Sequence, residues 1–95
     1  MLRITHHPGA GHDTLLLEGK LSRECIEEVR QALAQVRQDG VAIAIDLSGL
    51  RFIDDDGVRL LREYRTGGAS LLRATPFVRA LLDPLPRWRR RPRLR

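Results

Sequence analysis

The chain has 95 residues, which is enough for one domain and too few for a second. Its single cysteine, Cys25, excludes an internal disulfide and any metal site built from a pair of cysteines. No apolar run approaches the roughly 18 residues of a membrane span, and the N-terminal residues lack the apolar stretch of a signal peptide. We therefore expect a cytoplasmic protein.

The formal net charge of +5 comes from the C-terminal end of the chain. Residues 87–95 contain six arginines and no acidic residue, whereas residues 1–86 carry eleven basic and twelve acidic residues, a net charge of −1. We expect a domain over residues 1–83, followed by a flexible basic tail over residues 84–95. The arginines and Trp88 of the tail suit binding to nucleic acid or anionic lipid, but short basic ends are usually only solvated. The nearly neutral domain itself is not predicted to bind nucleic acid.

The first half of the chain predicts two strands and a helix. Residues 2–5 and 14–18 are expected to pair as a hairpin, because the residues between them are rich in Pro, Gly and His and are typical of a turn. Ser22 suits the N-cap of the following helix. Apolar residues then recur at helical spacing up to a closing glycine, Gly40. These apolar residues are Ile26, Val29, Leu33 and Val36.

The second half predicts two strands, each followed by a helix. Residues 41–45 are apolar throughout, as in a buried parallel strand, and a turn is expected at Asp46, Ser48 and Gly49. A helix should run from the aspartates at 54–56 to about Thr66, and residues 69–73 should form a short strand. Thr75 is the expected N-cap of a last helix. The expected apolar face of that helix consists of Phe77, Val78, Leu81 and Leu82.

The order of these elements, β-β-α-β-α-β-α, predicts a small α/β fold: a mixed sheet of about four strands with helices packed on it.

The three consecutive aspartates, Asp54, Asp55 and Asp56, are the strongest candidate for function. A helix N-terminus tolerates such acids because its free N–H groups and partial positive charge stabilise carboxylates. In the simplest interpretation Asp54 caps the helix while Asp55 and Asp56 are solvated. Alternatively, the acids form a surface that a partner reads with Arg or Lys. A Mg²⁺ or Ca²⁺ site is the least favoured interpretation, because adjacent residues rarely converge on one ion.

Other candidate sites have simpler structural explanations. His6, His7 and His12 with Asp13 have the chemistry to bind a transition metal, but a solvated hairpin loop is the simpler interpretation. Cys25 has no base in any identifiable motif and is expected to be a partly buried structural thiol. We find no nucleophile motif and no phosphate-binding glycine loop. We predict that the protein is not an enzyme and needs neither a cofactor nor a metal.

Three stretches of the sequence resemble the signature stretches of the STAS domain family, which is named after sulphate transporters and anti-sigma factor antagonists. They are Leu-Glu-Gly-Lys-Leu-Ser at 17–22, Ile-Asp-Leu-Ser-Gly-Leu at 45–50 and Phe-Ile-Asp-Asp-Asp-Gly-Val at 52–58. The resemblance covers roughly residues 1–83, with the elements in the expected order. The helix after Gly57 is about one turn shorter than is usual in the family.

The resemblance implies a non-enzymatic module that binds a protein partner in bacterial transcription regulation. In the anti-sigma factor antagonists, the residue before this glycine is a serine that a partner kinase phosphorylates, and phosphorylation controls partner switching. That position is Asp56 here, so phosphorylation at this position is impossible. A carboxylate carries one negative charge where a phosphate carries about two. Asp56 is therefore either a partial substitute for phosphoserine or only an acid at the start of a helix.

The expected partner surface comprises Lys20, Ser22, Asp54, Asp55, Asp56, Gly57 and Arg59. The resemblance points first to an anti-sigma factor or a related kinase-like ATPase as the partner. An alternative is a STAS subunit that docks on the ATPase of a lipid or solute ABC transporter, and a further alternative is polyanion binding through the arginine tail. We expect a monomer or a weak homodimer.

Overall fold

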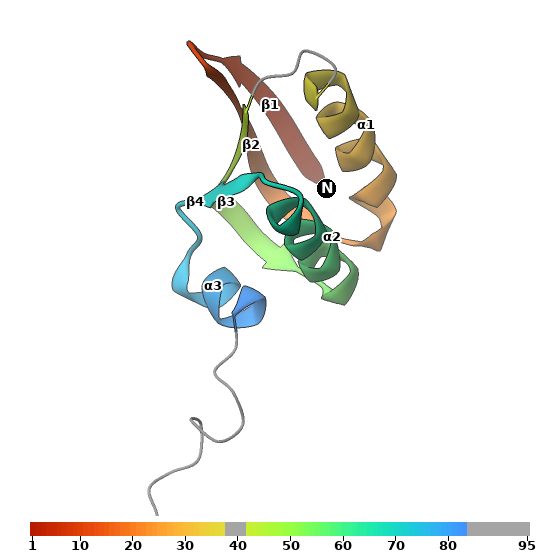
Figure 1. Ribbon diagram of the computed structural model, residues 1–95. Coiled ribbons are helices and arrows are strands. Elements are labelled where there is room, and N and C mark those ends of the chain that lie inside the picture. Colours follow the sequence, from red (N-terminus) through yellow and green to blue (C-terminus); the bar gives the residue numbers. More distant parts are fainter. Residues whose placement is uncertain (38–41, 84–95) are drawn as a thin grey trace, which may run out of the picture.

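The computed structural model describes residues 1–37 and 42–83 (Figure 1). The expected helix end at Gly40 and the expected tail over residues 84–95 lie outside these ranges. The elements run in the order β1 (Leu2–Pro8), β2 (His12–Leu21), a 3₁₀ turn η1 (Arg23–Cys25), α1 (Ile26–Arg37), β3 (Ala42–Ile53), α2 (Asp55–Thr66), β4 (Ser70–Leu72) and α3 (Pro76–Leu82).

The four strands form one mixed sheet in the order β1-β2-β3-β4. Strand β1 pairs antiparallel with β2, whereas β2–β3 and β3–β4 are parallel pairs. Helices α1 and α2 connect the parallel strands and lie on one face of the sheet, while α3 packs beside α2 near β3 (Figure 1). The predicted fold is confirmed.

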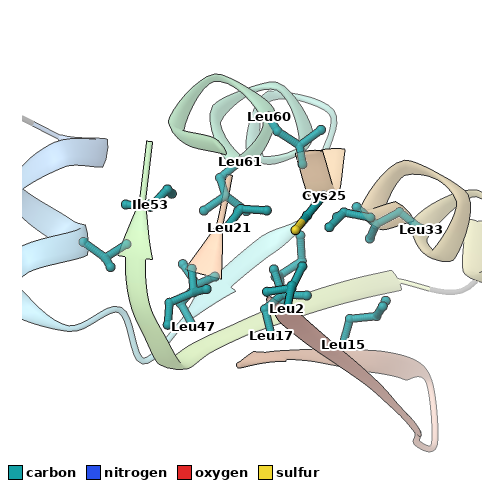
Figure 2. Close-up of a cluster of buried hydrophobic side chains, with 14 of the residues drawn as sticks. Leu2, Leu15, Leu17, Leu21, Cys25, Leu33, Leu47, Ile53, Leu60 and Leu61 are labelled. Atoms are coloured by element: carbon teal, nitrogen blue, oxygen red, sulfur yellow. The ribbon is translucent and has the colours of Figure 1, made fainter. Parts of the chain in front are cut away.

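One hydrophobic core lies between the sheet and the helices (Figure 2). Leu15, Leu17 and Leu21 of β2 alternate toward it, and each is almost completely buried. They contact a layer of helix side chains that includes Leu33 of α1 and Leu61 of α2. The core therefore holds both helices over the two central strands. No helix in the described part of the chain is long and apolar enough to cross a membrane.

The N-terminal hairpin has longer strands than the sequence predicts. His6, His7 and Pro8 belong to β1, and His12 and Asp13 belong to β2, so the turn is confined to residues 9–11. The prediction of a solvated loop is wrong for Asp13, which is buried and accepts hydrogen bonds from Gly9 N (3.3 Å) and from the His6 ring (2.9 Å). Paired backbone groups outweigh the local turn preference here.

Strand β3 is also longer than predicted. Asp46, Ser48 and Gly49 do not form a turn between two segments but lie inside β3. The register moves from Leu16↔Asp46 to Glu18↔Gly49, and again from Gly19↔Leu50 to Lys20↔Phe52, so β3 contains one extra residue at each of two places, and each is a β-bulge. The Asp46 carboxylate accepts a hydrogen bond from Ser48 N (2.9 Å), which explains why these residues look like a turn in the sequence.

Of three predicted helix ends and caps, two are confirmed and the third is confirmed only in its position. Helix α2 ends at Thr66 and Thr75 caps α3 through Val78 N (3.3 Å), both as predicted. Ser22 occupies the predicted N-cap position, but its side chain does not cap the helix; it donates a hydrogen bond to Glu24 (3.2 Å).

The buried apolar face of α3 is narrower than predicted. Val78 and Leu82 are buried, but Phe77 and Leu81 are 52% and 38% exposed. A seven-residue helix packed on its neighbours through one side buries only residues spaced four apart.

Candidate functional site

The candidate site forms where the chain leaves β2 and β3 and enters the two helices. Asp54 lies at its centre, because its two carboxylate oxygens accept backbone N–H groups from different helix starts. Oδ1 accepts from Gly57 N of α2 (2.9 Å), and Oδ2 accepts from Arg23 N at the start of η1 (2.8 Å). One side chain therefore caps α2 and also ties it to the segment that precedes α1.

These hydrogen bonds keep Asp54 ionised. Partial burial by itself raises the pKa of a carboxyl group, but the N–H groups of Gly57 and Arg23 favour the charged form and outweigh that effect. The pKa of Asp54 is consequently below its ordinary value of 3.8.

Gly57 lets α2 approach the end of β2. The residue is buried, and a β-carbon placed there would lie 2.8 Å from both Ile53 Cγ1 and Leu21 O. Real β-carbons do not approach other atoms so closely, so only glycine fits without a shift of the backbone. Gly57 therefore fixes the position of the start of α2 and has no side chain to present to a partner.

Asp55 and Asp56 follow the cap in the first turn of α2. Asp55 is exposed, and the side chain of Asp56 is 40% exposed. Among the described residues, Asp56 has one neighbouring cation, Arg59, with 3.6 Å between Oδ1 and the guanidinium. Carboxylate charge at this point is accessible to a partner and is only loosely neutralised.

The remaining residues of the predicted surface lie on the neighbouring segment. Lys20 is exposed at the end of β2, and Ser22 is half-buried just before η1. The hydrogen bond from Arg23 N to Asp54 joins this segment to the start of α2. Residues distant in sequence are thereby brought to one end of the molecule.

A groove of about 390 Å³ between α1 and α2 extends this surface. Ile26 and Leu60 provide its apolar lining. The guanidinium of Arg30 donates two hydrogen bonds to Glu63 across the groove, at 3.0 and 3.1 Å. Charged side chains form the rest of its lining. They are Arg23, Glu27, Asp56 and Arg59.

The sequence interpretation missed this groove. A signal was present, because Arg23, Glu27 and Arg30 are spaced for one helix face, as are Asp56, Arg59 and Glu63. The spacing identifies each face but does not show that the two faces meet, which depends on the packing of both helices on one sheet.

The structure gives little support to other site chemistry. Among residues 1–37 and 42–83, no three His, Cys, Asp or Glu side chains are grouped so as to hold a metal ion. The Cys25 thiol is buried and donates a long hydrogen bond to Lys20 O (3.7 Å). Its position is that of a packed structural thiol.

The fold and the capped acidic helix start define a small STAS-like α/β domain. The family model described as "Mlab, STAS domain" matches residues 6–85. The chain therefore belongs to the STAS domain family. No curated protein matches the sequence significantly.

Solved structures have the same fold at low sequence identity. The unphosphorylated form of the anti-sigma factor antagonist SpoIIAA is 22% identical, with a TM-score of 0.67 over 88% of this chain and 84% of that chain. An anti-sigma factor antagonist from Mycobacterium paratuberculosis is 19% identical, with a TM-score of 0.65 over 75% of this chain and 64% of that chain. A DUF3478 family protein from Shewanella loihica PV-4, described as having a SpoIIAA-like fold, is 13% identical. Its TM-score is 0.54 over 80% of this chain and 69% of that chain.

Proposed function

We propose that this protein is a non-enzymatic binding module that recognises a protein partner through the start of α2. We call the recognition region the helix-start surface and define it by Lys20, Ser22, Asp54, Asp55, Asp56, Gly57 and Arg59. The observation that carries the proposal is the Asp54 carboxylate, which fixes α2 and the β2–η1 segment relative to each other while leaving Asp55 and Asp56 accessible. Such a preformed surface avoids part of the ordering cost of binding.

The charges favour a partner that presents arginine or lysine. Asp55 and Asp56 stand at the exposed start of α2, and Arg59 is the only described cation within 4.0 Å of either carboxylate. A basic side chain from the partner would gain a charge-assisted hydrogen bond there. The groove beside the acids offers apolar contact through Ile26, and such contact contributes more to affinity than an exposed ion pair does.

The family resemblance suggests the partner class, and the missing hydroxyl at position 56 bears on how binding is controlled. The STAS family resemblance points to an anti-sigma factor or a kinase-like ATPase, with binding that phosphorylation of Asp56 cannot switch. A specific observation also favours the alternative of a subunit docked on the ATPase of a lipid or solute ABC transporter, because a permanent carboxylate suits a constitutive interface. In either case the proposed location is the cytoplasm.

Co-purification of the full chain from its native host distinguishes these partners. We expect mass spectrometry to identify either a kinase-like ATPase or an ABC ATPase. The double variant Asp55→Lys/Asp56→Lys should lose most of that partner, whereas Thr66→Lys, at the exposed far end of the same helix, should retain it. Equal retention by both variants would refute the helix-start surface.

Restoring a hydroxyl tests the phosphorylation step separately. Asp56→Ser, incubated with a co-purified kinase-like ATPase and labelled ATP, should become phosphorylated while the native chain does not. If Asp56→Ser changes neither phosphorylation nor partner binding, Asp56 has no part in recognition.

A further inference from the structure

Strand β1 has an open edge. It is the first strand of the sheet and pairs only with β2 among the described elements. Lys20 N donates to Met1 O (3.0 Å), and hydrogen-bonded pairs alternate along an antiparallel ladder. Arg3, Thr5 and His7 therefore bond to β2. The N–H and C=O groups that point away from the sheet are those of the alternate residues, Leu2, Ile4 and His6.

An open groove of about 710 Å³ adjoins this edge. It lies on the helix side of the sheet, because residues of α1 line it together with Ile4 and His6 of β1. Ile4, Leu15 and Val36 contribute apolar surface, and Gln31 and Gln35 of α1 contribute amides that can donate and accept hydrogen bonds.

The edge lacks the usual protection against pairing. Isolated edge strands are commonly blunted by inward-pointing charges, by bulges or by a proline in mid-strand. In β1 the charged residue Arg3 lies on the face away from the helices, and Pro8 stands at the last position of the strand. The register of β1 with β2 is regular from Leu2 to Pro8, without a bulge.

We propose that β1 pairs antiparallel with β1 of a second copy of this chain, centred on Ile4, to form a two-fold symmetric dimer with a continuous eight-stranded sheet. In this register Ile4 faces Ile4 of the second copy, and Leu2 faces His6. On the opposite face Arg3 faces Thr5, so no like charges lie directly across from each other. A register centred on Arg3 would instead place two guanidinium groups opposite each other, which is unfavourable.

This pairing uses the backbone groups of the edge and brings the two grooves together at the symmetry axis. The contact is isologous, so it closes at two chains and leaves neither β1 edge free. It is independent of the helix-start surface, which lies around the ends of β2 and β3, so each dimer would present two such surfaces.

The native full chain provides the first test. Light scattering after gel filtration should show twice the mass of one chain at high micromolar concentration, with dissociation on dilution. In hydrogen exchange, the amides of Ile4 and His6 should slow by about tenfold or more as the dimer forms. The Thr5 amide, already bonded to β2, should not respond. A single-chain mass at all concentrations overturns the proposal.

Cysteine cross-linking tests the register. In a Cys25→Ser background, Ile4→Cys places two thiols across the axis with Cα atoms about 5.5 Å apart, a separation that a disulfide spans. The matched control Thr5→Cys separates the thiols by about 7–8 Å on a diagonal and should not cross-link. A dimer in which the two variants cross-link equally, or neither does, uses another surface and also overturns the proposal.

Charge at the axis provides a third test. Ile4→Lys should convert the dimer to monomer, whereas Thr5→Glu, which places the opposite charge across from Arg3 of the second copy, should leave it intact. Circular dichroism should confirm that both variants fold. Hydrogen exchange on the native chain decides the question if Ile4→Lys does not fold.

Discussion

The guanidinium of Arg73 donates a hydrogen bond to the carboxylate of Asp46 at 2.8 Å, and Arg73 is the only non-glycine residue of the described chain with a positive φ, 54°. Asp46 is buried within β3, and Arg73 directly follows β4. The ion pair therefore stabilises a strained backbone where the short edge strand ends. Left-handed backbone costs a non-glycine residue about 1–2 kcal/mol.

Two substitutions of Arg73 distinguish the energetic cost of the backbone strain from the contribution of the ion pair. Arg73→Ala retains the unfavourable φ and leaves the Asp46 carboxylate with one partner fewer, so we expect a loss of about 1–2 kcal/mol in the free energy of unfolding. Arg73→Gly loses the same pair but relieves the backbone strain, so it should be less destabilising than Arg73→Ala. Urea denaturation of the two variants measures the difference, and equal losses would contradict the strain.

The double role of Asp54 predicts that serine replaces only part of it. Asp54→Ala should destabilise the protein by about 1–2 kcal/mol, as for loss of an N-cap. Asp54→Ser restores an acceptor for Gly57 N but has no second oxygen for Arg23 N. We therefore expect a smaller loss of stability than in Asp54→Ala, together with faster hydrogen exchange at Arg23. Unchanged exchange at Arg23 in Asp54→Ser would show that the second hydrogen bond is unimportant.

The lowered pKa values of Asp46 and Asp54 predict that the protein loses stability in acid. Burial by itself raises the pKa of Asp46, but hydrogen bonds from Ser48 and the charge of Arg73 outweigh it, so the pKa of this group, like that of Asp54, lies below 3.8. A carboxyl group whose pKa is lower in the folded than in the unfolded state contributes stability that is fully present above the unfolded pKa. That contribution is lost as the pH falls through the folded pKa.

The free energy of unfolding should therefore fall as the pH drops below about 4. Urea titrations between pH 7 and pH 3 measure this slope. The slope should be shallower in Asp54→Asn, which lacks one of the titrating groups, and an identical slope would contradict the role of Asp54.

Replacing Gly57 by alanine should lower the stability of the protein, although alanine has a higher helix propensity than glycine. Gly57→Ala would force a methyl group against Ile53 and the Leu21 carbonyl, both 2.8 Å away. Overpacking of this kind costs typically about 1–3 kcal/mol, more than the roughly 1 kcal/mol that alanine gains over glycine in a helix. Thermal unfolding should show a lower Tm for Gly57→Ala, and little change for the control Thr66→Ala at the exposed end of α2.

Much of the architecture could be predicted from the sequence because it follows from local chemistry and periodicity. The apolar spacing of Val29, Leu33 and Val36 predicts a helix face that the structure buries. Asp54 and Thr75 are caps because a short polar side chain before a helix can accept an N–H group three residues later. The order of the elements then leaves few ways to build a sheet.

The errors occurred where a local signal competed with strand pairing. Asp46 and Ser48 form a local hydrogen bond typical of turns. The chain nevertheless continues as a strand, because β3 pairs with both β2 and β4. His6 and Asp13 look like loop residues until their strands pair and place the two side chains in contact. Pairing of distant segments satisfies many backbone groups at once, so it outweighs the preference of single residues.

The sequence by itself therefore determined the class of the domain, the capped start of α2 and the absence of a phosphorylatable hydroxyl at position 56, since each is a property of neighbouring residues. Only the tertiary structure showed that Asp54 also holds Arg23, that α1 and α2 enclose a groove, and that β1 leaves an open edge. The first two relationships join residues about 30 positions apart in the sequence. The third depends on the strand order, which leaves β1 with a partner on one side only. The packing of both helices on one face of the sheet decides them, and no local pattern encodes that packing.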